Sequence, residues 1–366
     1  MWKINIILSF VISLGITWFV IPKILLISFK KKLFDFVDDR KVHEGVVPRL
    51  GGVAFMPSIV LTFALLIGLN SSIVSGFTNV TMFASPYLSM MLCCLLILYL
   101  EGIADDLIGL RYRGKFLLQI TCGILLTLSG LWINNLGGLF GVYELSVWVG
   151  VPLSIFLIVF LINAINLIDG IDGLASGLSG IAALFFGCLF LYRREWCYAM
   201  LAFTTLGTLI PFFYFNMFGD VNRGRKIFMG DTGSQTIGLV LAVLAIQLSN
   251  VDPTLAHPIH SPIIIAFSLL FTPAIDVVRV VMHRAVHGKH LFKPDRNHIH
   301  HKFLALGFSH HAAMLTILSL SAGFVLLNLL MVYVLHANIN IILFTDIALW
   351  TVLNIGLSKQ IKGVKK

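Results

Sequence analysis

The stretch VWVGVPLSIFLIVFLINAINLIDGIDG, residues 147–173, joins a charge-free apolar run to a polar ending. About 20 apolar residues form a helix long enough to cross the hydrocarbon layer of a bilayer. Residues 147–165 are therefore predicted to span a membrane. The polar ending places an amide or a carboxylate at every third position, namely Asn163, Asn166, Asp169 and Asp172. Neighbouring members of this set share one face of a helix. A helix cap explains only one of these four side chains.

The rest of the chain repeats this apolar character. Of its 366 residues, 58% are hydrophobic and only 12% are charged, about half the charged fraction of a soluble domain. The mean hydropathy is +0.94. We expect an all-α, polytopic integral membrane protein of about 11 transmembrane helices, folded as one domain over residues 1–366. The expected spans are 4–27, 50–69, 87–104, 116–133, 147–165, 174–192, 197–215, 234–249, 262–283, 313–335 and 339–357.

Basic residues are distributed unequally between the two faces that these spans define. The connections on one face, with the tail after residue 357, hold 21 of the 26 Lys and Arg residues. Cytoplasmic loops of membrane proteins carry such an excess. The N-terminus is therefore predicted outside and the C-terminus in the cytoplasm. Membrane topology also explains the net charge of +9, so that the bilayer, and no nucleic acid, is the expected partner.

Acidic and histidine side chains follow the same asymmetry, which topology does not require. Eleven of the 17 carboxylates and nine of the 12 histidines lie in or beside the segments on the predicted cytoplasmic face. A reaction site is the natural reason. We expect it to be formed by five cytoplasmic loops, at about 28–49, 105–115, 163–173, 216–233 and 284–312.

Two motifs on this face combine acids with bases or amides. Asp105 and Asp106 open the loop DDLIGLRYRGK, which also supplies Lys115. Paired carboxylates beside basic groups suit a Mg²⁺ and phosphate site, although a solvated loop with an acidic helix cap is the alternative. The motif NAINLIDGIDGLASG, residues 163–177, has no Lys or Arg. Its amides and carboxylates favour a bound cation or sugar hydroxyls.

Two further motifs lie closer to the C-terminus. In FMGDTGSQ, residues 228–235, a turn precedes an apolar span, and a helix N-terminus favours anions. Asp231 there is a candidate ligand for a hard cation, with a plain N-cap as the alternative. In DRNHIHHKF, residues 295–303, arginine and lysine alternate with histidine and no cysteine is near. This pattern suits a phosphate clamp better than a zinc site.

Three other polar features carry weaker expectations. The loop 35–52 ends in PRLGG, a predicted tight turn with a loosely assigned role in the site. Asp276 and Arg279 lie three residues apart and are expected to pair with each other. Asp346 lies inside the last span, where an ionisable group is a candidate for function. No motif surrounds it, so a carboxylate with a partner is the better interpretation.

These four motifs, in this order, resemble the polyprenyl-phosphate N-acetylhexosamine-1-phosphate transferases over roughly residues 20–312. That superfamily includes the WecA and TagO enzymes and the MraY translocase. The resemblance implies an enzyme of the bacterial cytoplasmic (inner) membrane with its site on the cytoplasmic face. It also implies dependence on Mg²⁺, with Mn²⁺ as an alternative. Such an enzyme transfers a sugar 1-phosphate from a UDP-N-acetylhexosamine to undecaprenyl phosphate and releases UMP, which starts a cell-envelope polysaccharide.

The resemblance also assigns roles to single residues of the four motifs. Asn166 and Asp231 become metal ligands. Asp105, Asp106 and His298 become catalytic, and Asp106 is expected to organise the lipid phosphate more than to deprotonate it, because a phosphate is already ionised near pH 7. The implied substrate-binding residues are Lys115, Asp169, Asp172, Asn216, Phe228, Arg296, His300 and His301.

Two departures from the family pattern bear on the substrate. After Asn216 the chain continues through a longer, basic NMFGDVNRGRK, which puts a contact of Asn216 with uracil in doubt. The histidine motif reads HIHH, where MraY-type enzymes have three consecutive histidines. This favours a simple donor, GlcNAc first and QuiNAc or FucNAc next, over the MraY reaction. A transporter or lipid flippase is the alternative of another class, and a homodimer is expected by analogy with the family.

Overall fold

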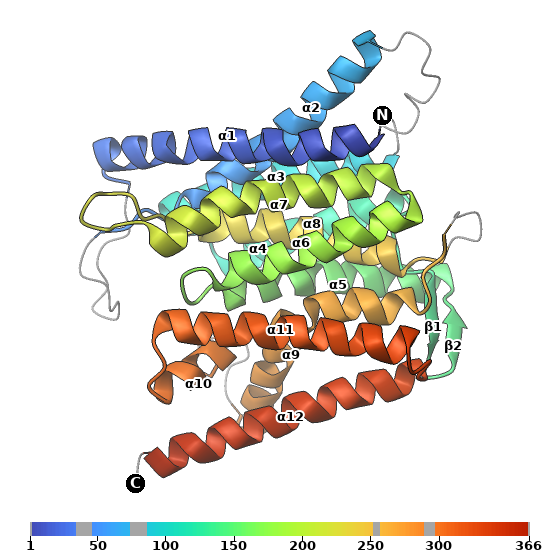
Figure 1. The fold of residues 1–366 in the computed structure, drawn as a ribbon. Coiled ribbons are helices and arrows are strands. Elements are labelled where there is room, and N and C mark those ends of the chain that lie inside the picture. The colour runs from blue at the N-terminus through green and yellow to red at the C-terminus, as the bar shows by residue number, and fades with distance from the viewer. Residues whose placement is uncertain (1, 34–45, 74–85, 252–256, 289–296, 365–366) are drawn as a thin grey trace.

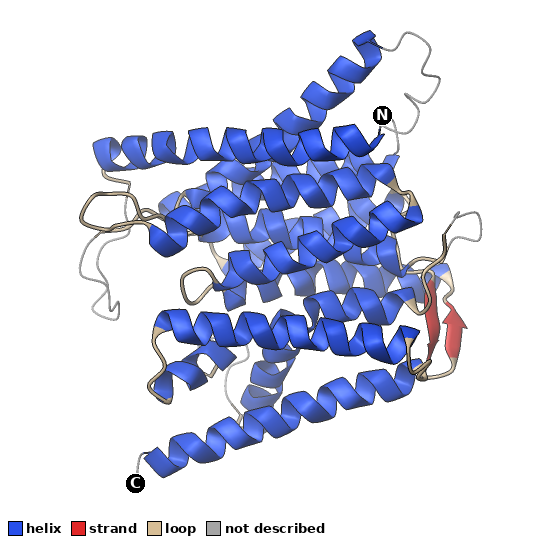
Figure 2. Ribbon diagram, viewed as in Figure 1, coloured by secondary structure: helices blue, strands red, loops and turns tan. Residues whose placement is uncertain are grey.

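The computed structural model describes residues 2–33, 46–73, 86–251, 257–288 and 297–364, and helices make up nearly all of it (Figures 1 and 2). The expected fold class, an all-α polytopic membrane protein, is confirmed. In the described part, nine helices are long and apolar enough to cross a membrane. The long helices are α1 (Trp2–Lys31), α2 (Phe55–Ile73), α3 (Pro86–Ile108), α4 (Tyr112–Leu128), α5 (Val147–Ile168), α6 (Leu174–Arg193), α7 (Trp196–Phe218), α8 (Gly230–Ser249), α9 (Pro262–Val286), α11 (His310–Tyr333) and α12 (Ile339–Val364).

Each of the expected spans corresponds to one of these helices, but several boundaries differ. The connection within the segment 105–115 is shorter than expected and covers residues 109–111, because α3 continues to Ile108 and α4 already begins at Tyr112. Likewise α5 continues to Ile168, so that the first part of the segment 163–173 is helical. The expected tail after residue 357 is helical as far as Val364. Apolar content marks where a helix is buried in lipid, and these helices continue beyond that layer.

Short elements lie at the two ends of the bundle. The helix α10 (Ile299–Ala305) and the single 3-10 turn η1 (Gly51–Ala54) lie towards one end. The antiparallel strands β1 (Asn135–Leu139) and β2 (Val142–Glu144) form a hairpin at the other end, drawn in red in Figure 2. The two ends of the described chain also lie at opposite ends of the bundle (Figure 1). We call the end with α10 the site end.

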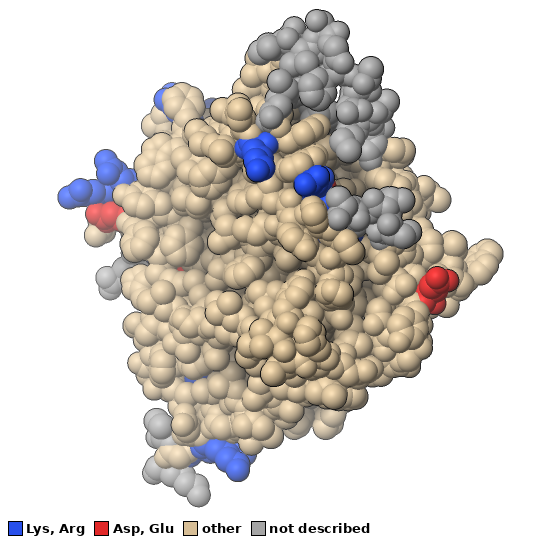
Figure 3. All heavy atoms as spheres, turned by 45° about the vertical axis from the view of Figure 1, so that its right-hand side comes forward, with Lys and Arg blue, Asp and Glu red and all other residues tan. Residues whose placement is uncertain are grey.

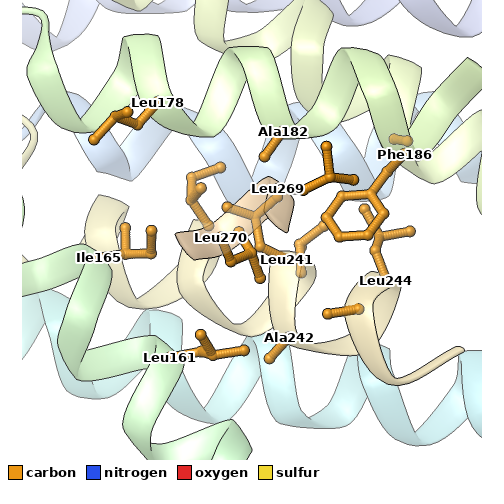
Figure 4. Packing of buried hydrophobic residues seen from close by; sticks show 14 of the residues in the cluster. Leu161, Ile165, Leu178, Ala182, Phe186, Leu241, Ala242, Leu244, Leu269 and Leu270 are labelled. Atoms are coloured by element: carbon orange, nitrogen blue, oxygen red, sulfur yellow. The ribbon is translucent and has the colours of Figure 1, made fainter. Parts of the chain in front are cut away.

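Helix α8 forms the centre of the bundle. Of its most apolar 18-residue window, 94% is buried, and α3, α5, α6, α7 and α9 pack around it. Figure 4 shows leucine, isoleucine, alanine and phenylalanine side chains of α5, α6, α8 and α9 meeting in this core. Outside the core, uncharged surface dominates the view in Figure 3, interrupted by isolated charged side chains. Such a surface fits a lipid environment.

Helix α9 changes direction within the bundle (Figure 1). Pro273 lies inside this helix, and a proline in a helix interior removes one backbone hydrogen bond and bends the helix. Asp276 follows Pro273 closely and is fully buried. The bend therefore begins just before the part of α9 that serves the site described below.

The carboxylate inside the last span has a partner, as expected from the sequence. The Asn328 side-chain amide of α11 donates a hydrogen bond to Asp346 Oδ2 of α12 at 2.7 Å, and both residues are fully buried. A polar pair of this kind joins two transmembrane helices where no water is available. Asp346 therefore belongs to the packing of α11 against α12.

A glycine in α8 allows a close approach of α5 in the core. A Cβ atom on Gly238 would lie 2.7 Å from Ile162 Cα of α5, whereas a Cβ on Gly323 of α11 would meet nothing within 4 Å. Gly238→Ala must therefore push α5 and α8 apart, at a cost of about 1–3 kcal/mol. We expect a lower melting temperature in detergent for this variant. Gly323→Ala is the matched control, and equal melting temperatures for both variants would contradict the packing described here.

Candidate functional site

Three carboxylates meet at the site end, where α3 ends and α8 begins. Asp105 and Asp106 lie in the last turns of α3, and Asp231 lies in the first turn of α8. One oxygen of each lies within 4.8 Å of the others. Asp231 lies about 125 positions after the other two in the chain, and the packing of α3 against α8 brings the three together. Uncompensated negative charge at this spacing favours a cation or strong hydrogen-bond donors.

Asp106 provides the N-terminal cap of α8 from another helix. Its Oδ1 accepts the Asp231 N–H at 2.7 Å, and its Oδ2 accepts the Thr232 N–H at 3.0 Å and the Thr232 hydroxyl at 2.6 Å. The first N–H groups of a helix lack partners within the helix, and a carboxylate there also favours the helix dipole. The predicted anion site at the FMGD turn is thus filled by the protein's own carboxylate.

Backbone geometry at Gly230 lets Asp106 reach this position. Gly230 has a φ of +72°, and a Cβ there would lie 2.1 Å from the Arg49 carbonyl oxygen and 2.6 Å from Asp106 Oδ2. Glycine adopts this left-handed conformation without a steric penalty. The glycine of the Gly-Asp-Thr-Gly motif therefore makes room for the carboxylate that caps the helix.

Lys115, in the first turn of α4, links the other two carboxylates. Its ammonium forms ion pairs with Asp105, at 2.5 Å, and with Asp231. The second oxygen of Asp105 accepts the Leu110 N–H at 2.6 Å. Thus the single lysine offsets part of the charge of the cluster. Its ammonium is therefore the positive charge in direct contact with the carboxylate cluster.

The oxygen atoms around Asp231 suit a hard divalent cation. Asn166, near the end of α5, lies beside Asp231 and donates its amide N–H to the Ser234 hydroxyl at 2.8 Å. The Asn166 carbonyl oxygen takes no part in this hydrogen bond and stays an acceptor, on a side chain that lies beside Asp231. Mg²⁺ binds such oxygen ligands and usually completes its shell with water and phosphate oxygens. The residues present therefore fit a Mg²⁺ ion.

The segment after α5 is held in place by two contacts with the region around residue 220. Asp172 forms an ion pair with Lys226 at 2.6 Å. The Gly173 N–H donates to Asn216 Oδ1 at 2.7 Å, and Asn216 Nδ2 donates to the Ile227 carbonyl at 2.9 Å. Asn216 is buried, with 4% of its surface exposed. The oxygen and the nitrogen of its amide thus each bind a backbone group, which gives Asn216 a structural role.

Asp169 lies between this segment and the carboxylate cluster. Desolvation by the surrounding protein is the main cause that raises its pKa to about 7, although much of the residue's own surface is exposed. The guanidinium of Arg49 lowers the pKa, whereas Asp172, Asp231 and Asp106 raise it further. Asp169 therefore faces both the cluster and a basic group of the PRLGG turn.

The PRLGG turn is part of the site after all. The Phe228 N–H donates to the Pro48 carbonyl at 2.8 Å, and the Gly51 and Gly52 N–H groups donate to Phe228 and Met229 at 2.9 and 2.8 Å. This short extended pairing fixes the FMGD turn before α8 begins. The acidic and histidine residues expected in the same loop, Asp38, Asp39 and His43, lie outside the described residues.

The histidine motif meets the segment after α5. A Cβ on Gly170 would lie 2.3 Å from His300 Nε2, so the imidazole of His300 packs directly on the Gly170 backbone. His298 and His300 are stacked with ring centroids 5.8 Å apart, and His301 lies 4.2 Å from His300. The fourth motif therefore adjoins the second, as the common face predicted. Arg296 lies outside the described residues.

Asp276 anchors this histidine motif from inside the bundle. Its Oδ2 pairs with His298 Nδ1 at 2.8 Å, and its Oδ1 accepts from Arg279 at 2.7 Å and from the Ile299 N–H at 3.1 Å. The expected pairing of Asp276 with Arg279 is confirmed, but it is only part of the role. A carboxylate on Nδ1 fixes the orientation of the imidazole ring and leaves Nε2 outside this contact.

Burial determines the charge state around α10. His300 is only 2% exposed, and burial, ahead of the neighbouring histidines, lowers its pKa to about 3. His300 is therefore neutral at physiological pH. Burial also lowers the pKa of Lys302 to about 8, and its ammonium donates to Ser358 Oγ at 3.0 Å in α12. Lys302 thus fastens α10 to the last helix.

A row of buried polar side chains beneath the carboxylate cluster was not expected from the sequence. Asn163 donates to Gln119 at 2.6 Å, Gln119 donates to Gln235 at 3.4 Å, and Gln235 lies beside Glu101. The residues come from four helices, and only Asn163 and Gln235 belong to motifs that the sequence indicated. The signal of Gln119 and Glu101 in the sequence was only the presence of an amide and an acid inside apolar runs.

The chain is similar to known proteins over most of its length. A model of glycosyl transferase family 4 matches residues 87–249, which include α3, α5, α8 and most of the site. The chain is 29% identical, over 80% of its length and 74% of theirs, to undecaprenyl-phosphate alpha-N-acetylglucosaminyl 1-phosphate transferases of Yersinia pestis and Escherichia coli K12. It is 28% identical to a probable undecaprenyl-phosphate N-acetylglucosaminyl 1-phosphate transferase of Bacillus subtilis, over 86% of this chain and 81% of that protein.

The cap at α8 leads to a test of what Asp106 does. Asp106→Asn replaces an acceptor oxygen with an amide that faces N–H donors, so we expect a loss of about 1–2 kcal/mol of stability, the usual value of a helix cap. Differential scanning fluorimetry in detergent measures it, with Asp220→Asn, at an exposed carboxylate, as the control. An unchanged melting temperature would show that Asp106 does not hold the helix.

Proposed function

We propose that the chain acts as a member of glycosyl transferase family 4, whose model matches residues 87–249, and that it transfers N-acetylglucosamine 1-phosphate from UDP-GlcNAc to undecaprenyl phosphate and releases UMP. The observation that carries this proposal is the meeting of Asp105, Asp106, Asp231 and Lys115 at one end of a membrane bundle. A charged cluster at that position is accessible to a soluble nucleotide-sugar and to the head of a membrane lipid. The names of the relatives support the same donor and acceptor.

The proposed reaction is an in-line displacement at phosphorus. An oxygen of the lipid phosphate forms a bond with the β-phosphorus of the donor, while the bond from that phosphorus to the bridging oxygen breaks and UMP leaves with the electron pair. Both reactants are anions, so positioning and charge neutralisation dominate such a transfer. Lys115 supplies the positive charge from this chain, and Asp105 holds the ammonium in position.

Mg²⁺ bound by Asp231 and Asn166 would neutralise the diphosphate charge and orient its oxygens. Asp106 then acts by fixing the first turn of α8, and with it the direction of the Asp231 carboxylate. This role agrees with the expectation that Asp106 organises more than it deprotonates. Its two oxygens already accept three hydrogen bonds, which makes a free base at this position unfavourable.

The donor is proposed to lie across the segment after α5 and the histidine motif. Asp169 and Asp172 offer acceptors for sugar or ribose hydroxyls, and His298 offers its Nε2 to a phosphate oxygen or the sugar. His300, neutral and packed on Gly170, supports the shape of that segment. Asn216 binds backbone groups with both its oxygen and its nitrogen. We therefore assign Asn216 the role of holding the segment after α5 in position, and no contact with uracil.

The site end is proposed to face the cytoplasm of a bacterial cell, at the inner membrane. The basic residues that sequence analysis placed on the cytoplasmic side include those of the site end, among them Lys115 and Lys226. The positive-inside rule orients such loops towards the cytoplasm. A donor carrying a nucleotide would then reach the site without crossing the membrane.

The proposal is tested by UMP release from purified protein in detergent. We expect UMP from UDP-GlcNAc only with undecaprenyl phosphate and a divalent cation, and loss of the signal on addition of EDTA that Mg²⁺ restores. UDP-GalNAc, UDP-glucose and UDP-MurNAc-pentapeptide complete the donor panel. Lys115→Met should lower the rate about 10²-fold or more, because a charge in contact with the reacting phosphates is lost. Folded protein without UMP release from any of these donors would contradict the proposal.

The contact between Asp276 and His298 gives a second test, which concerns a positioning residue. We expect His298→Gln to lower kcat about 10²-fold and Asp276→Asn to lower it about tenfold, because the ring loses its orientation. The double variant should be no slower than His298→Gln alone, since coupled residues are not additive. Additive losses would show that Asp276 acts elsewhere. Asp346→Asn, which changes another buried carboxylate, is the control for the effect of removing a buried charge.

A further inference from the structure

A groove of about 750 Å³ lies at the site end between α1, α7 and the loop 219–225. Its walls are apolar and largely aromatic, with Trp18, Leu26 and Phe29 on α1 and Tyr214 and Phe218 on α7. The volume is within the range of small-molecule sites. None of the carboxylates or histidines of the proposed active site lines this groove, and neither α3 nor α4 reaches it.

The groove opens towards the surroundings of the bundle. Trp18, Leu26 and Phe218 keep 47%, 62% and 65% of their surfaces exposed, and they belong to helices long and apolar enough to cross a membrane. Exposed apolar side chains of such helices face lipid chains. The Trp18 ring lies 5.3 Å from Tyr214 and 5.5 Å from Phe215, so the wall is a continuous aromatic surface against which a flexible chain can pack.

A basic loop closes the groove at the site end. It carries Arg223 and Arg225 with a single acid, Asp220, which contacts Arg223 at 3.3 Å while both side chains remain exposed. Among the described residues, the Arg225 guanidinium has neither a hydrogen bond nor an ion pair. The loop therefore offers a net positive charge next to an apolar groove.

The loop has a fixed shape, which distinguishes it from a tail of solvated charges. The Arg225 N–H donates to the Asp220 carbonyl at 2.9 Å, and the Asn222 N–H donates to the Asp220 side chain at 2.9 Å. Gly224 turns with a φ of +62° against the ring of Phe29. The two arginines are thus presented from a closed turn that packs on α1.

We propose that this groove binds one anionic phospholipid of the leaflet next to the site end. An acyl chain lies along the aromatic wall, and the phosphate contacts Arg223 and Arg225. Basic clusters at the edge of a membrane attract anionic lipids by about 1 kcal/mol for each Lys or Arg, a factor of about five in affinity. The acceptor lipid of the proposed reaction is not the occupant, because its phosphate must reach Asp105 and Lys115, which lie on other helices.

Native mass spectrometry of the full chain tests the proposal, with phosphatidylglycerol and phosphatidylcholine as probes. We expect the wild type to retain one phosphatidylglycerol in preference to phosphatidylcholine. The double variant Arg223→Gln/Arg225→Gln should lower the affinity for phosphatidylglycerol about fivefold for each charge removed and leave phosphatidylcholine unchanged. Leu26→Trp, which fills the groove, should weaken both lipids. Lys3→Gln is the control, because Lys3 is an exposed charge at the opposite end of α1.

Two results would overturn the proposal. The first is equal retention of phosphatidylglycerol by the wild type and the double arginine variant, provided that their melting temperatures agree. The second is displacement of phosphatidylglycerol by undecaprenyl phosphate with the same dependence on the two arginines, which would make the groove a site for the acceptor. Both readouts measure binding, so they are independent of whether UMP is released from UDP-GlcNAc.

Discussion

The hydrogen bonds from the first turn of α8 to the Asp106 carboxylate hold the site together. They join the end of α3 to the beginning of the most deeply buried helix. Because α8 is surrounded by other helices of the bundle, its first turn is held in place by their packing. Asp231 belongs to that turn, and Lys115 and Asn166 reach it from α4 and α5. A helix cap, normally a matter of local stability, here sets the direction of a candidate metal ligand.

Charge is compensated differently in the two halves of the site. Around Asp231, carboxylates are close together and a single lysine offsets them in part, which leaves a preference for further positive charge. Around α10, one buried carboxylate, Asp276, already meets an arginine, a histidine and a backbone N–H group. The first half thus suits a cation with phosphates, whereas the second half presents oriented imidazoles, among them the buried, neutral His300. This division is what a diphosphate donor with a sugar at one end requires.

The loop after α7 connects the active site with the lipid-facing groove. Its closed turn presents Arg223 and Arg225. After the turn, Lys226 pairs with Asp172, and before it, Asn216 of α7 binds the backbone of Gly173 and Ile227. Its extra length relative to the family pattern therefore does not interrupt the site. The added residues form a closed turn on α1, and the residues on either side of that turn keep the segment after α5 in position.

The sequence by itself determined the class of fold, the approximate spans, the motifs and their common face, because apolar length and charge distribution act locally along the chain. It also predicted that Asp105, Asp231 and the histidines belong to one site. The tertiary structure decided what each side chain does. The cap by Asp106, the anchoring of His298 by Asp276 and the backbone contacts of Asn216 join residues from 22 to 126 positions apart or from separate helices. Hydrogen bonds of this kind depend on which helices pack together, and local sequence pattern contains no information about that.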